Sequence, residues 1–334
     1  MLVLLEYGYP LLPYVQWAKP LLSKALNNSV YSETGLISPD DKSVVRPNVD
    51  TLYSEVAVDL SHTDLELIIP SIPNGRFYVF PFYDLYGNNF ANLGSITNSP
   101  NGTYLGFIDF PTTYGAILIR FVLYNNDSDV EVIKAIQEQI QMSPIDRPDT
   151  SDPAAPWLSS SFLDSGLSDD AALTWPGSFS NTATTQLLNL TARLYPYAPP
   201  DNTSDTTRVT TYLTAAGLNL SAGIYSPPPN VNFTASNLII DARLNAQLDS
   251  PTSYVNLSGS SWLATATSLS GDFQSDYVTR ANVAWAGYLQ LLASVAIYPE
   301  YYGLGGSAGA NILNATNESA LLFSFSGKPP VDGF

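Results

Sequence analysis

Between Tyr53 and Leu123 the chain contains short runs in which apolar and polar residues alternate. From Tyr53 onward apolar side chains recur at every second position, the period of a strand with one face against a core. Turn signals rich in Pro, Asn and Gly separate the runs. We therefore expect a strand that begins at Tyr53, followed by strands over residues 65–69, 76–82, 104–108 and 116–123. Short strands in succession favour a β-sandwich or a barrel-like sheet.

Helical patterns flank this strand-rich stretch. The N-terminal segment is aromatic and helical in pattern, but Pro10, Pro13 and Pro20 must break or kink it. The capping box Ser128-Asp129-Val130-Glu131 begins a helix that Pro144 ends. Further helices are expected over residues 184–195, 204–216 and 235–248, and the clearest one over Asp276–Ile297, before a strand over 320–325.

Composition removes several classes of function. The chain has 334 residues, of which 45% are hydrophobic and only 13% charged, with a formal net charge of −17. Nucleic acids and anionic membrane surfaces are therefore unsuitable partners, and no apolar run is long enough to insert into a membrane. The absence of Cys excludes disulfides and thiolate sites. His62 is the single His, so a zinc site built on several imidazoles is excluded, and we expect neither a metal nor a cofactor.

Sequons for N-glycosylation are more frequent than chance predicts. Pairing 24 Asn at random with 62 Ser or Thr in 334 residues gives about 4.5 Asn-x-Ser/Thr motifs, and the chain has ten. The excess favours a secreted glycoprotein, with general richness in Asn, Ser and Thr as the alternative. The opening residues are too short for a signal segment, so a signal would lie outside this numbering. The predicted acceptors are Asn27, Asn101, Asn126, Asn189, Asn202, Asn219, Asn232, Asn256, Asn314 and Asn317.

Ordered sequence blocks over nearly the whole chain resemble the DUF1254/DUF1214 proteins, although residues 150–270 match loosely. The blocks are Tyr7-Gly8-Tyr9-Pro10, Arg46-Pro47-Asn48-Val49-Asp50-Thr51-Leu52-Tyr53-Ser54 with Asp59-Leu60, Pro73-Asn74-Gly75-Arg76-Phe77-Tyr78, Asp84-Leu85-Tyr86-Gly87-Asn88-Asn89-Phe90, Arg120, Tyr277-Val278-Thr279-Arg280-Ala281, Tyr298-Pro299 and Pro329-Pro330-Val331-Asp332-Gly333-Phe334.

The resemblance implies an α+β, β-dominated protein with two antiparallel β-sandwich or barrel-like domains and a helical, loop-rich region between them. On that basis residues 1–145 form a DUF1254-like domain with an N-terminal helix, and 146–270 connect it to a DUF1214-like domain that starts at 271. This last domain, a long helix plus a strand within 271–334, looks truncated, with a differently closed sheet as the alternative. The family implies no reaction. The sequons and low charge suggest a secreted, fungal-type branch.

The segment around Asn48, Asp50 and Tyr53 concentrates hydrogen-bonding groups where a loop enters a strand. These groups form either one wall of a polar pocket or an Asx-type support for the loop. Arg76 and Arg120 lie within strongly apolar strands. Each needs a carboxylate partner, for which Asp50 and Asp84 are the candidates, and a buried ion pair is favoured over a substrate-binding role.

Other polar residues complete the candidate site. Asp84 and Asp50 could form a carboxylate pair for glycoside or ester hydrolysis, although acidic chains offer many such pairs. Tyr277 and Arg280 share one face of a helix, where a surface salt bridge from Asp276 to Arg280 is the alternative. His62 in a polar turn is more typical of an exposed side chain than of a base. The predicted ligand-binding residues are Asn48, Asp50, Tyr53, Arg76, Tyr78, Asn88, Arg120, Tyr277 and Arg280, and the catalytic candidates are Asp50, Asp84 and Arg120.

These patterns predict a secreted glycoprotein with a polar pocket within residues 46–122 that binds, and can convert, a small neutral or weakly acidic compound. The alternative from another class is a non-catalytic surface or wall-associated glycoprotein that binds carbohydrate or self-assembles. It predicts a flat surface with exposed aromatic rings. A glycoside hydrolase is a third hypothesis. The expected partner is a small molecule or a glycan, and a homo-oligomer is compatible with the sequence.

Overall fold

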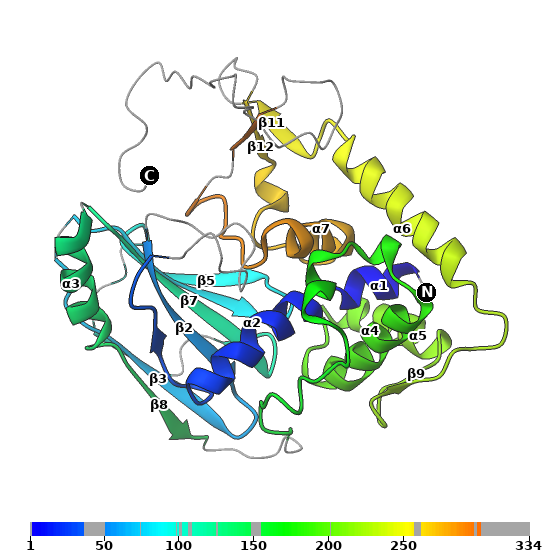
Figure 1. Cartoon of the computed structure of the whole chain (residues 1–334), viewed down its shortest axis with the longest axis horizontal. Helices are drawn as coiled ribbons and strands as arrows, with labels where there is room; N and C mark the ends of the chain where they lie inside the picture. The colour runs from blue at the N-terminus through cyan, green and yellow to red at the C-terminus, as the bar shows by residue number, and fades with distance from the viewer. Residues whose placement is uncertain are drawn as a thin grey trace.

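A computed structural model describes residues 2–36, 51–73, 75–97, 99, 102–105, 109–124, 126–147, 155–200, 202–256, 262–296 and 299–301. A five-stranded antiparallel sheet lies at its centre, in the order β1-β2-β7-β4-β5. Figure 1 shows this sheet on one side of the molecule and most of the helices on the other. The strands are β1 (Tyr31–Ser32), β2 (Thr51–Asp59), β7 (Tyr114–Val122), β4 (Tyr78–Asp84) and β5 (Asn89–Gly94).

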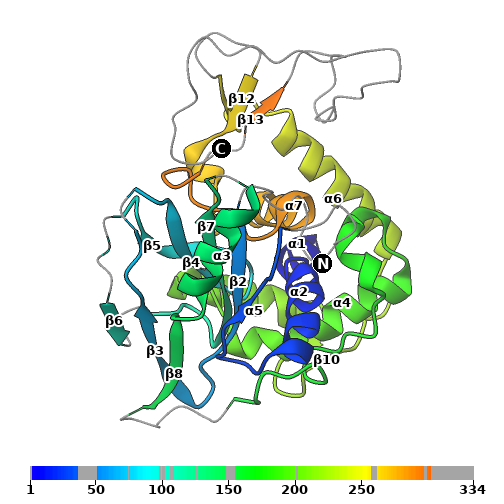
Figure 2. The ribbon, with the colours of Figure 1, turned by 60° about the vertical axis from the view of Figure 1, so that its left-hand side comes forward.

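The longest pairing joins β2 to β7, from Thr51 opposite Val122 to Asp59 opposite Tyr114. A second sheet has the order β6-β3-β8, with β6 (Gly102–Leu105), β3 (Thr63–Ile69) and β8 (Gln141–Asp146). It continues from β2 through a short turn, and Figure 2 shows it beside the five-stranded sheet. Helix α3 (Asn126–Gln137) connects β7 to β8.

Each face of the five-stranded sheet has its own core. Because side chains alternate along a strand, Val56 and Val58 of β2 lie on one face, while Tyr53 and Ala57 lie on the other. The first face packs against β3 and α3. Its buried residues include Leu52, Val56, Val58, Leu67, Ile69, Phe80, Phe82, Ile117, Ile119, Phe121, Ile133 and Ile136.

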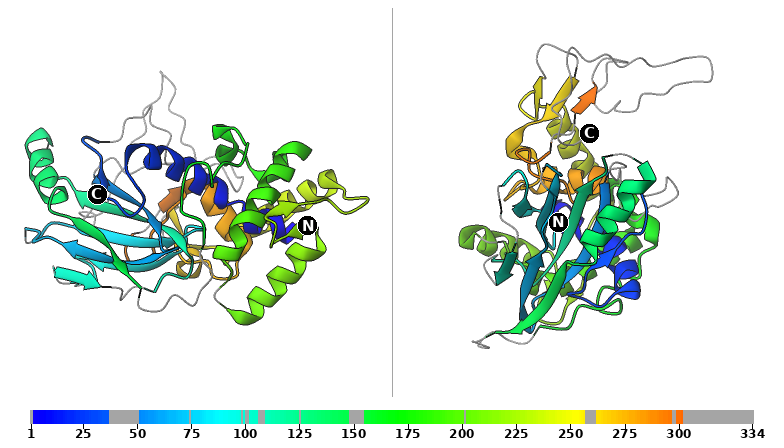
Figure 3. Two further views of the ribbon diagram at one scale, coloured as in Figure 1. Left: turned by 90° about the horizontal axis from the view of Figure 1, so that it is seen from below. Right: turned by 90° about the vertical axis from the view of Figure 1, so that its left-hand side faces the viewer.

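The second face packs against a group of helices. These are α1 (Leu2–Gly8), α2 (Leu11–Lys24), α4 (Asn181–Leu194), α5 (Thr203–Ala215), α6 (Phe233–Leu248) and α7 (Tyr277–Gly287). Figure 3 shows most of them at the end of the molecule opposite α3, whereas α2 lies beside the strands. Short 3-10 helices lie at 169–173, 176–178, 195–197 and 267–269, with a hairpin of β9 (Leu218–Asn219) and β10 (Ile224–Tyr225) and a small sheet of β11 (Tyr254–Asn256), β12 (Trp262–Thr265) and β13 (Pro299–Tyr301).

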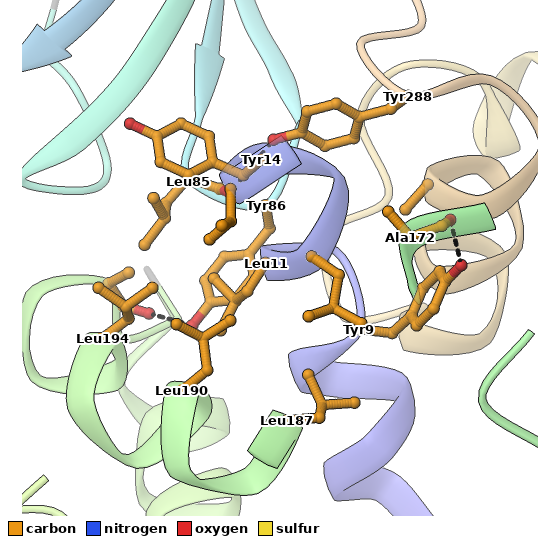
Figure 4. Close-up of a cluster of buried hydrophobic side chains, with 14 of the residues drawn as sticks. Tyr9, Leu11, Tyr14, Leu85, Tyr86, Ala172, Leu187, Leu190, Leu194 and Tyr288 are labelled. Atoms are coloured by element: carbon orange, nitrogen blue, oxygen red, sulfur yellow. Dashed lines mark hydrogen bonds between the residues drawn. The ribbon is translucent and has the colours of Figure 1, made fainter. Parts of the chain in front are cut away.

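One cluster of buried residues extends from Leu4 in α1 to Leu291 after α7. Figure 4 shows part of it, where α2, the β4–β5 turn and α4 meet around Leu11, Tyr86 and Leu190. This cluster contains residues of all three predicted segments, 1–145, 146–270 and 271–334. The boundaries between those segments remain a prediction.

The mixed architecture with antiparallel sheets is confirmed, although helices contain more of the described residues than strands do. The strands expected from alternation correspond to β2, β3, β4, β6 and β7, and the three weaker helices to α4, α5 and α6. Pro10 falls between α1 and α2 as a break, whereas Pro20 lies inside α2.

The expected long helix Asp276–Ile297 is wrong in length. Helix α7 ends at Gly287, because Tyr288 takes an extended conformation and Leu289 has a φ of 62°. The Tyr288 hydroxyl donates to the Leu85 carbonyl at 3.4 Å, so tertiary packing overrides the helical pattern there. The expected strand over 320–325 lies outside the described residues.

Candidate functional site

A pocket of about 480 Å³ lies on the face of the five-stranded sheet that carries β3. Two cross-strand pairs contribute to its floor, Phe82 opposite Ile117 in one sheet and Leu67 opposite Met142 in the other. Roughly 300–1,000 Å³ is the usual size of a small-molecule site. The space between the two sheets is therefore large enough for a ligand. Most of its lining residues are apolar, but polar atoms make up more than half of the surface that it exposes.

The rim of the pocket is charged. Arg147 donates from Nε to Asp64 Oδ1 at 2.8 Å and from Nη2 to the Leu60 carbonyl at 3.0 Å. The side chains of this pair are 28% and 35% exposed, so the pair is solvated. Asp109 adds a second, exposed carboxylate to the lining. The three ionised groups give the rim one excess negative charge.

The loop before β7 forms one wall of the pocket and is fixed by hydrogen bonds. Buried Thr112 donates to the Tyr114 carbonyl at 2.6 Å and accepts from Leu85 N at 3.0 Å. Thr113 N donates to the Tyr197 carbonyl at 2.9 Å. This bond ties the loop to a second wall of the pocket, made by Pro196, Tyr197 and Pro199.

Gly115 permits this wall to form. A Cβ at this position would lie 2.8 Å from Phe110 Cε1 and 2.5 Å from the Tyr83 carbonyl oxygen. Phe110 lines the pocket and packs edge-on against Phe82, with ring centroids 6.0 Å apart. The absence of a side chain at Gly115 thus lets the Phe110 ring lie over the sheet.

Of the predicted ligand-binding residues that the structure describes, none lines this pocket. Asn48 and Asp50 lie outside the described residues. The pocket residues escaped the sequence analysis because ordinary apolar strand positions form the floor. The interleaved charges of β3 and Arg147 were available as a signal, but their pairing joins residues 83 positions apart.

Arg76 forms a buried ion pair. Its Nη1 and Nη2 donate to the two carboxylate oxygens of Asp129 at 2.9 and 2.6 Å, and Nη1 also donates to the Val122 carbonyl at 2.6 Å. The Arg76 side chain is 4% exposed and lies over the Tyr124 ring. These hydrogen bonds lower the pKa of Asp129. The geometry corresponds to the ion-pair alternative, with Asp129 as the partner, and fastens the end of β7 to α3.

Arg120 lies on the opposite face of the sheet from the pocket and is half-buried. It donates from Nη2 to the Leu289 carbonyl at 3.2 Å, and its guanidinium lies 5.7 Å from the Tyr53 ring. Buried Tyr83 donates to the same carbonyl at 2.8 Å. These residues dock the segment after α7 onto the sheet.

Asp84 supports the turn between β4 and β5. Its Oδ1 accepts from Tyr86 N at 2.9 Å and from Asn88 N at 2.8 Å, and its Oδ2 accepts from Asn88 Nδ2 at 2.6 Å. Burial raises the pKa of Asp84, although these hydrogen bonds and Arg280 oppose the rise. Both carboxylate oxygens are thus occupied by the turn. Tyr78, another predicted ligand-binding residue, packs in the core on the β3 and α3 side of the sheet and donates to the Ser99 carbonyl at 3.3 Å.

Arg280 is 3% exposed and is enclosed by aromatic rings. Its guanidinium carbon lies 4.2, 4.7 and 4.8 Å from the ring centroids of Tyr86, Tyr277 and Tyr7. Nη2 donates to the Tyr7 carbonyl at 3.0 Å. Three sequence blocks therefore meet here, from α1, the β4–β5 turn and α7. The Tyr277 hydroxyl donates to Asp205, and burial raises the pKa of Tyr277.

A buried carboxylate that the sequence analysis did not single out lies between α1, α6 and α7. Glu6 is 0% exposed, and neither of its oxygens accepts a hydrogen bond from a described residue. Arg243 Nε approaches Glu6 Oε1 to 3.2 Å from the partly exposed face of α6. Burial raises the pKa of Glu6 to about 7, with Arg243 opposing the rise and Asp276 adding to it.

His62 stacks on Trp157, with ring centroids 4.0 Å apart and an interplanar angle of 10°. Its Nδ1 lies 2.7 Å from Ser61 Oγ, and Trp157 is 53% exposed. His62 is thus part of a surface aromatic pair. Within the described part of the chain, no group of three or more His, Asp or Glu side chains is placed to hold a metal ion. The helices described there include none that is long and apolar enough to cross a membrane.

The sequon asparagines occupy different environments. Those at 202, 219, 232 and 256 are exposed, those at 27 and 189 are half-buried, Asn126 begins α3, and Asn101, Asn314 and Asn317 lie outside the described residues.

Comparison with known proteins gives a family match for about a third of the chain. Residues 27–144 match the family described as "Protein of unknown function (DUF1254)". No curated protein matches the chain. Among solved structures, the chain is similar to the crystal structure of the VPA0106 protein from Vibrio parahaemolyticus. The TM-score is 0.51 at 11% identity, over 87% of this chain and 67% of that one. This likeness concerns the fold alone.

The DUF1254 match contains the floor of the pocket, including Leu67, Phe82, Ile117 and Met142. Arg147 and the wall at 196–199 lie beyond it. The pocket thus combines strands of the matched segment with residues contributed by the following, helical part of the chain.

Proposed function

We propose that this protein binds a small compound with both apolar and polar groups in the pocket between its two sheets. The observation that carries the proposal is the 480 Å³ pocket, with an apolar floor and a charged rim on one side. Apolar lining with a few polar groups at fixed positions is typical of small-molecule sites. Binding in this pocket requires neither Asp84 nor Arg120, which lie on other parts of the sheet.

The rim supports a neutral or cationic ligand. Arg147 is already paired with Asp64, and Asp109 supplies a further carboxylate. The net charge of −17 adds a long-range field that attracts cations and repels anions. The weakly acidic ligand expected from the sequence receives no support from this charge balance, whereas the neutral ligand does.

Nile red, a neutral apolar dye whose fluorescence rises on leaving water, tests the proposal. A bulky ring placed in the floor should block the pocket, so Met142→Trp should weaken dye binding at least tenfold. Ser143→Trp is the matched control. It lies on the same strand, but its side chain points to the opposite face. Equal binding by the wild type and both variants would place the dye elsewhere and remove the proposal.

Ligand charge can be tested with three competitors that share one ring. Benzylamine, benzyl alcohol and phenylacetate differ mainly in charge, so displacement of Nile red reports the preference of the rim. We expect benzylamine and benzyl alcohol to compete better than phenylacetate. The preference for benzylamine should decline as salt screens the charges.

A glycan ligand is the second candidate, and one observation favours it. Trp157 is 53% exposed and held flat against His62. Flat exposed aromatic rings suit stacking against sugars. Trp157→Ala should abolish retention on polysaccharide columns if this surface binds glycans, while leaving Nile red binding intact.

The excess of sequons supports a third part of the proposal, that the protein follows the secretory route and carries N-linked glycans. Detection of glycopeptides in protein purified from its natural source would test this part. Protein that is abundant there but lacks glycans would contradict it.

A further inference from the structure

We infer that Asn202, Asn219 and Asn232 accept N-linked glycans, whereas Asn27 and Asn189 do not. The inference rests on the secretory route proposed above. All ten sequons satisfy the same sequence motif, so the motif alone does not separate them. The environment that each asparagine takes up on folding does separate them, because a glycan at a site that becomes buried opposes folding, whereas one at an exposed site does not.

The three inferred acceptors share one geometry. Each is exposed and uses its side-chain oxygen to hold a local turn or helix start. Oδ1 of Asn202 accepts from Ser204 N at 3.0 Å, and Oδ1 of Asn232 accepts from Ala235 N at 2.9 Å, which caps α5 and α6. Oδ1 of Asn219 accepts from Ala222 N at 3.1 Å, in the turn after β9.

The nitrogen that would carry the sugar is left unused in this geometry. Nδ2 of each of the three makes no hydrogen bond to a described residue, and the side chains face solvent. A sugar on Nδ2 leaves Oδ1 free to remain an acceptor. Glycosylation of Asn202 and Asn232 is therefore compatible with the caps of α5 and α6.

At two of these sites the sequon hydroxyl also contacts the asparagine. Ser204 Oγ donates to Asn202 Oδ1 at 2.6 Å, and Ser221 Oγ donates to Asn219 Oδ1 at 2.9 Å. Donation to the amide oxygen draws electron density from the amide nitrogen and makes its N–H more acidic. These sequences therefore favour the local turn that brings the hydroxyl and the amide together.

The transfer itself needs a lipid-linked oligosaccharyl diphosphate as donor. Nδ2 forms a bond to C1 of the first sugar, while the bond from C1 to the diphosphate oxygen breaks. The lipid diphosphate leaves with the bonding electrons, and one Nδ2 proton passes to a base of the transferase. The acceptor side of this step requires an accessible Nδ2.

Asn27 has the opposite arrangement. It is half-buried, and its Nδ2 donates to Asp59 Oδ2 at 2.6 Å. Asp59 is 0% exposed and also accepts from Leu158 N at 2.8 Å. A sugar on Asn27 would crowd the donors of a buried carboxylate, which depends on them for its stability. Folding thus opposes a glycan at this site.

Asn189 lies inside α4, where helical backbone prevents the turn seen at Asn202 and Asn219. It is half-buried, and its Oδ1 accepts from Tyr225 N at 2.7 Å, so the side chain is directed at the β9–β10 hairpin. A glycan there would separate the hairpin from α4. Figure 1 shows the starts of α5 and α6 and strand β9 in the same part of the molecule as α4, so the exposure of each side chain, and not its region, separates these sites.

Expression behind a foreign secretion signal in a eukaryotic host tests the assignment. Glycans are released enzymatically in heavy-oxygen water, and peptide mass spectrometry gives the occupancy of each site. We expect most molecules to be occupied at Asn202, Asn219 and Asn232, and few at Asn27 and Asn189. Equal occupancy at Asn27 or Asn189, or empty sites at the other three, would overturn the inference.

Asparagine-to-aspartate variants supply a second measurement. Asn202→Asp and Asn232→Asp keep a capping oxygen but lose the acceptor nitrogen. Each should remove the mass of one glycan with little change in the thermal midpoint. Asn27→Asp is the matched control and should leave the glycan mass unchanged while reducing secretion, because it places a second carboxylate beside Asp59. Loss of one glycan in Asn27→Asp would contradict the assignment.

The site assignment and the secretory route can fail separately. The foreign signal forces the chain through the glycosylating compartment whatever its natural location. Protein from the natural source that lacks glycans, together with the expected occupancy in the host, would remove the proposed route and support the assignment.

Discussion

The two faces of the five-stranded sheet are both buried, yet they are built from different chemistry. The face toward β3 and α3 is lined by Phe, Ile, Leu and Val, and it opens into the pocket. The face toward the helices is rich in tyrosines that donate to backbone carbonyls. Tyr14 donates to Gly115, Tyr83 to Leu289, and Tyr86 to Ala198.

The two faces show that a region with many polar and charged side chains is not necessarily accessible to a ligand. The tyrosine side contains Asp84, Arg120 and Arg280, which contact turn amides, a backbone carbonyl and aromatic rings respectively. A polar group enclosed by protein atoms supports the fold and is shielded from solvent, even where a donor such as Arg280 Nε makes no hydrogen bond to a described residue. The pocket side has few charges, and those lie at a solvated rim. A segment rich in polar residues can therefore form a buried hydrogen-bond network as readily as a binding site.

The largest effect is expected for Arg280→Ala. It would remove the cation enclosed by Tyr7, Tyr86 and Tyr277 and leave buried Asp84 without its nearby positive charge. Breaking a buried charge network costs about 3–5 kcal/mol, which urea unfolding would measure. Lys134→Ala is the control, since Lys134 pairs with Glu131 on the exposed side of α3, and the Glu131 side chain is 73% exposed. A loss below about 1 kcal/mol for Arg280→Ala would mean that the aromatic enclosure is not a stabilising network.

The next largest effect is expected for the ion pair between Arg76, which lies just before β4, and Asp129 in α3. Asp129→Asn should cost about 2 kcal/mol, because Arg76 stays buried but loses its charged partner. The pKa of Asp129 is lowered in the folded protein. Its stabilising contribution is therefore present above the unfolded value of about 4 and is lost as pH falls through the folded pKa.

Unfolding of wild type and Asp129→Asn as a function of pH checks this pair. The two proteins should converge in stability at strongly acid pH and differ at neutral pH. The pocket contains neither residue, so Nile red affinity should be the same in both. A constant difference at all pH values would show that lost packing, and not charge, explains the effect.

The success of the sequence-based predictions also differs between strands and polar sites. Alternation located β2, β3, β4 and β7 because apolar residues dominate those strands. Strand β5 was missed since Asn89, Asn92 and Gly94 resemble a loop. Strand β8 was missed because Pro144 suggests a break, although Pro is tolerated on this edge strand. The blocks that resemble the DUF1254/DUF1214 proteins contain the residues that enclose Arg280. No local sequence pattern, however, shows whether such a cluster is accessible to a ligand.

A smaller effect, of opposite sign, is expected for Glu6→Gln. The folded pKa of Glu6 is about 7, above the ordinary 4.5. Ionising Glu6 therefore costs folding free energy, a cost that is absent below about pH 4.5 and complete above about pH 7. The pKa difference, which already includes the attraction of Arg243, sets an upper limit of about 3 kcal/mol, and residual solvation should reduce the cost to about 1–2 kcal/mol.

Thermal unfolding at two pH values tests the sign. Glu6→Gln should exceed wild type in stability near pH 8 and match it near pH 4. Glu131→Gln is the control, because its side chain is 73% exposed and its ion pair lies on the surface. Destabilisation by Glu6→Gln at pH 8 would mean that the attraction of Arg243 exceeds the cost of burying the charge.

The smallest change in stability is expected at the rim of the pocket, where the effect on binding is the more informative. Asp64→Asn removes one carboxylate and releases the Arg147 Nε from its partner at 2.8 Å. Because the pair is solvated, the cost should stay below about 1 kcal/mol.

The rim then changes from one excess negative charge to neutrality, with a freed guanidinium able to bind a carboxylate. Phenylacetate should gain several-fold in its displacement of Nile red relative to benzylamine. Asp146→Asn removes the same charge from an exposed position on β8 outside the pocket lining, and it should leave that ratio unchanged. If both variants shift the ratio equally, the preference comes from the overall field of the acidic protein, and the open side of the sheet contributes shape but no charge selectivity.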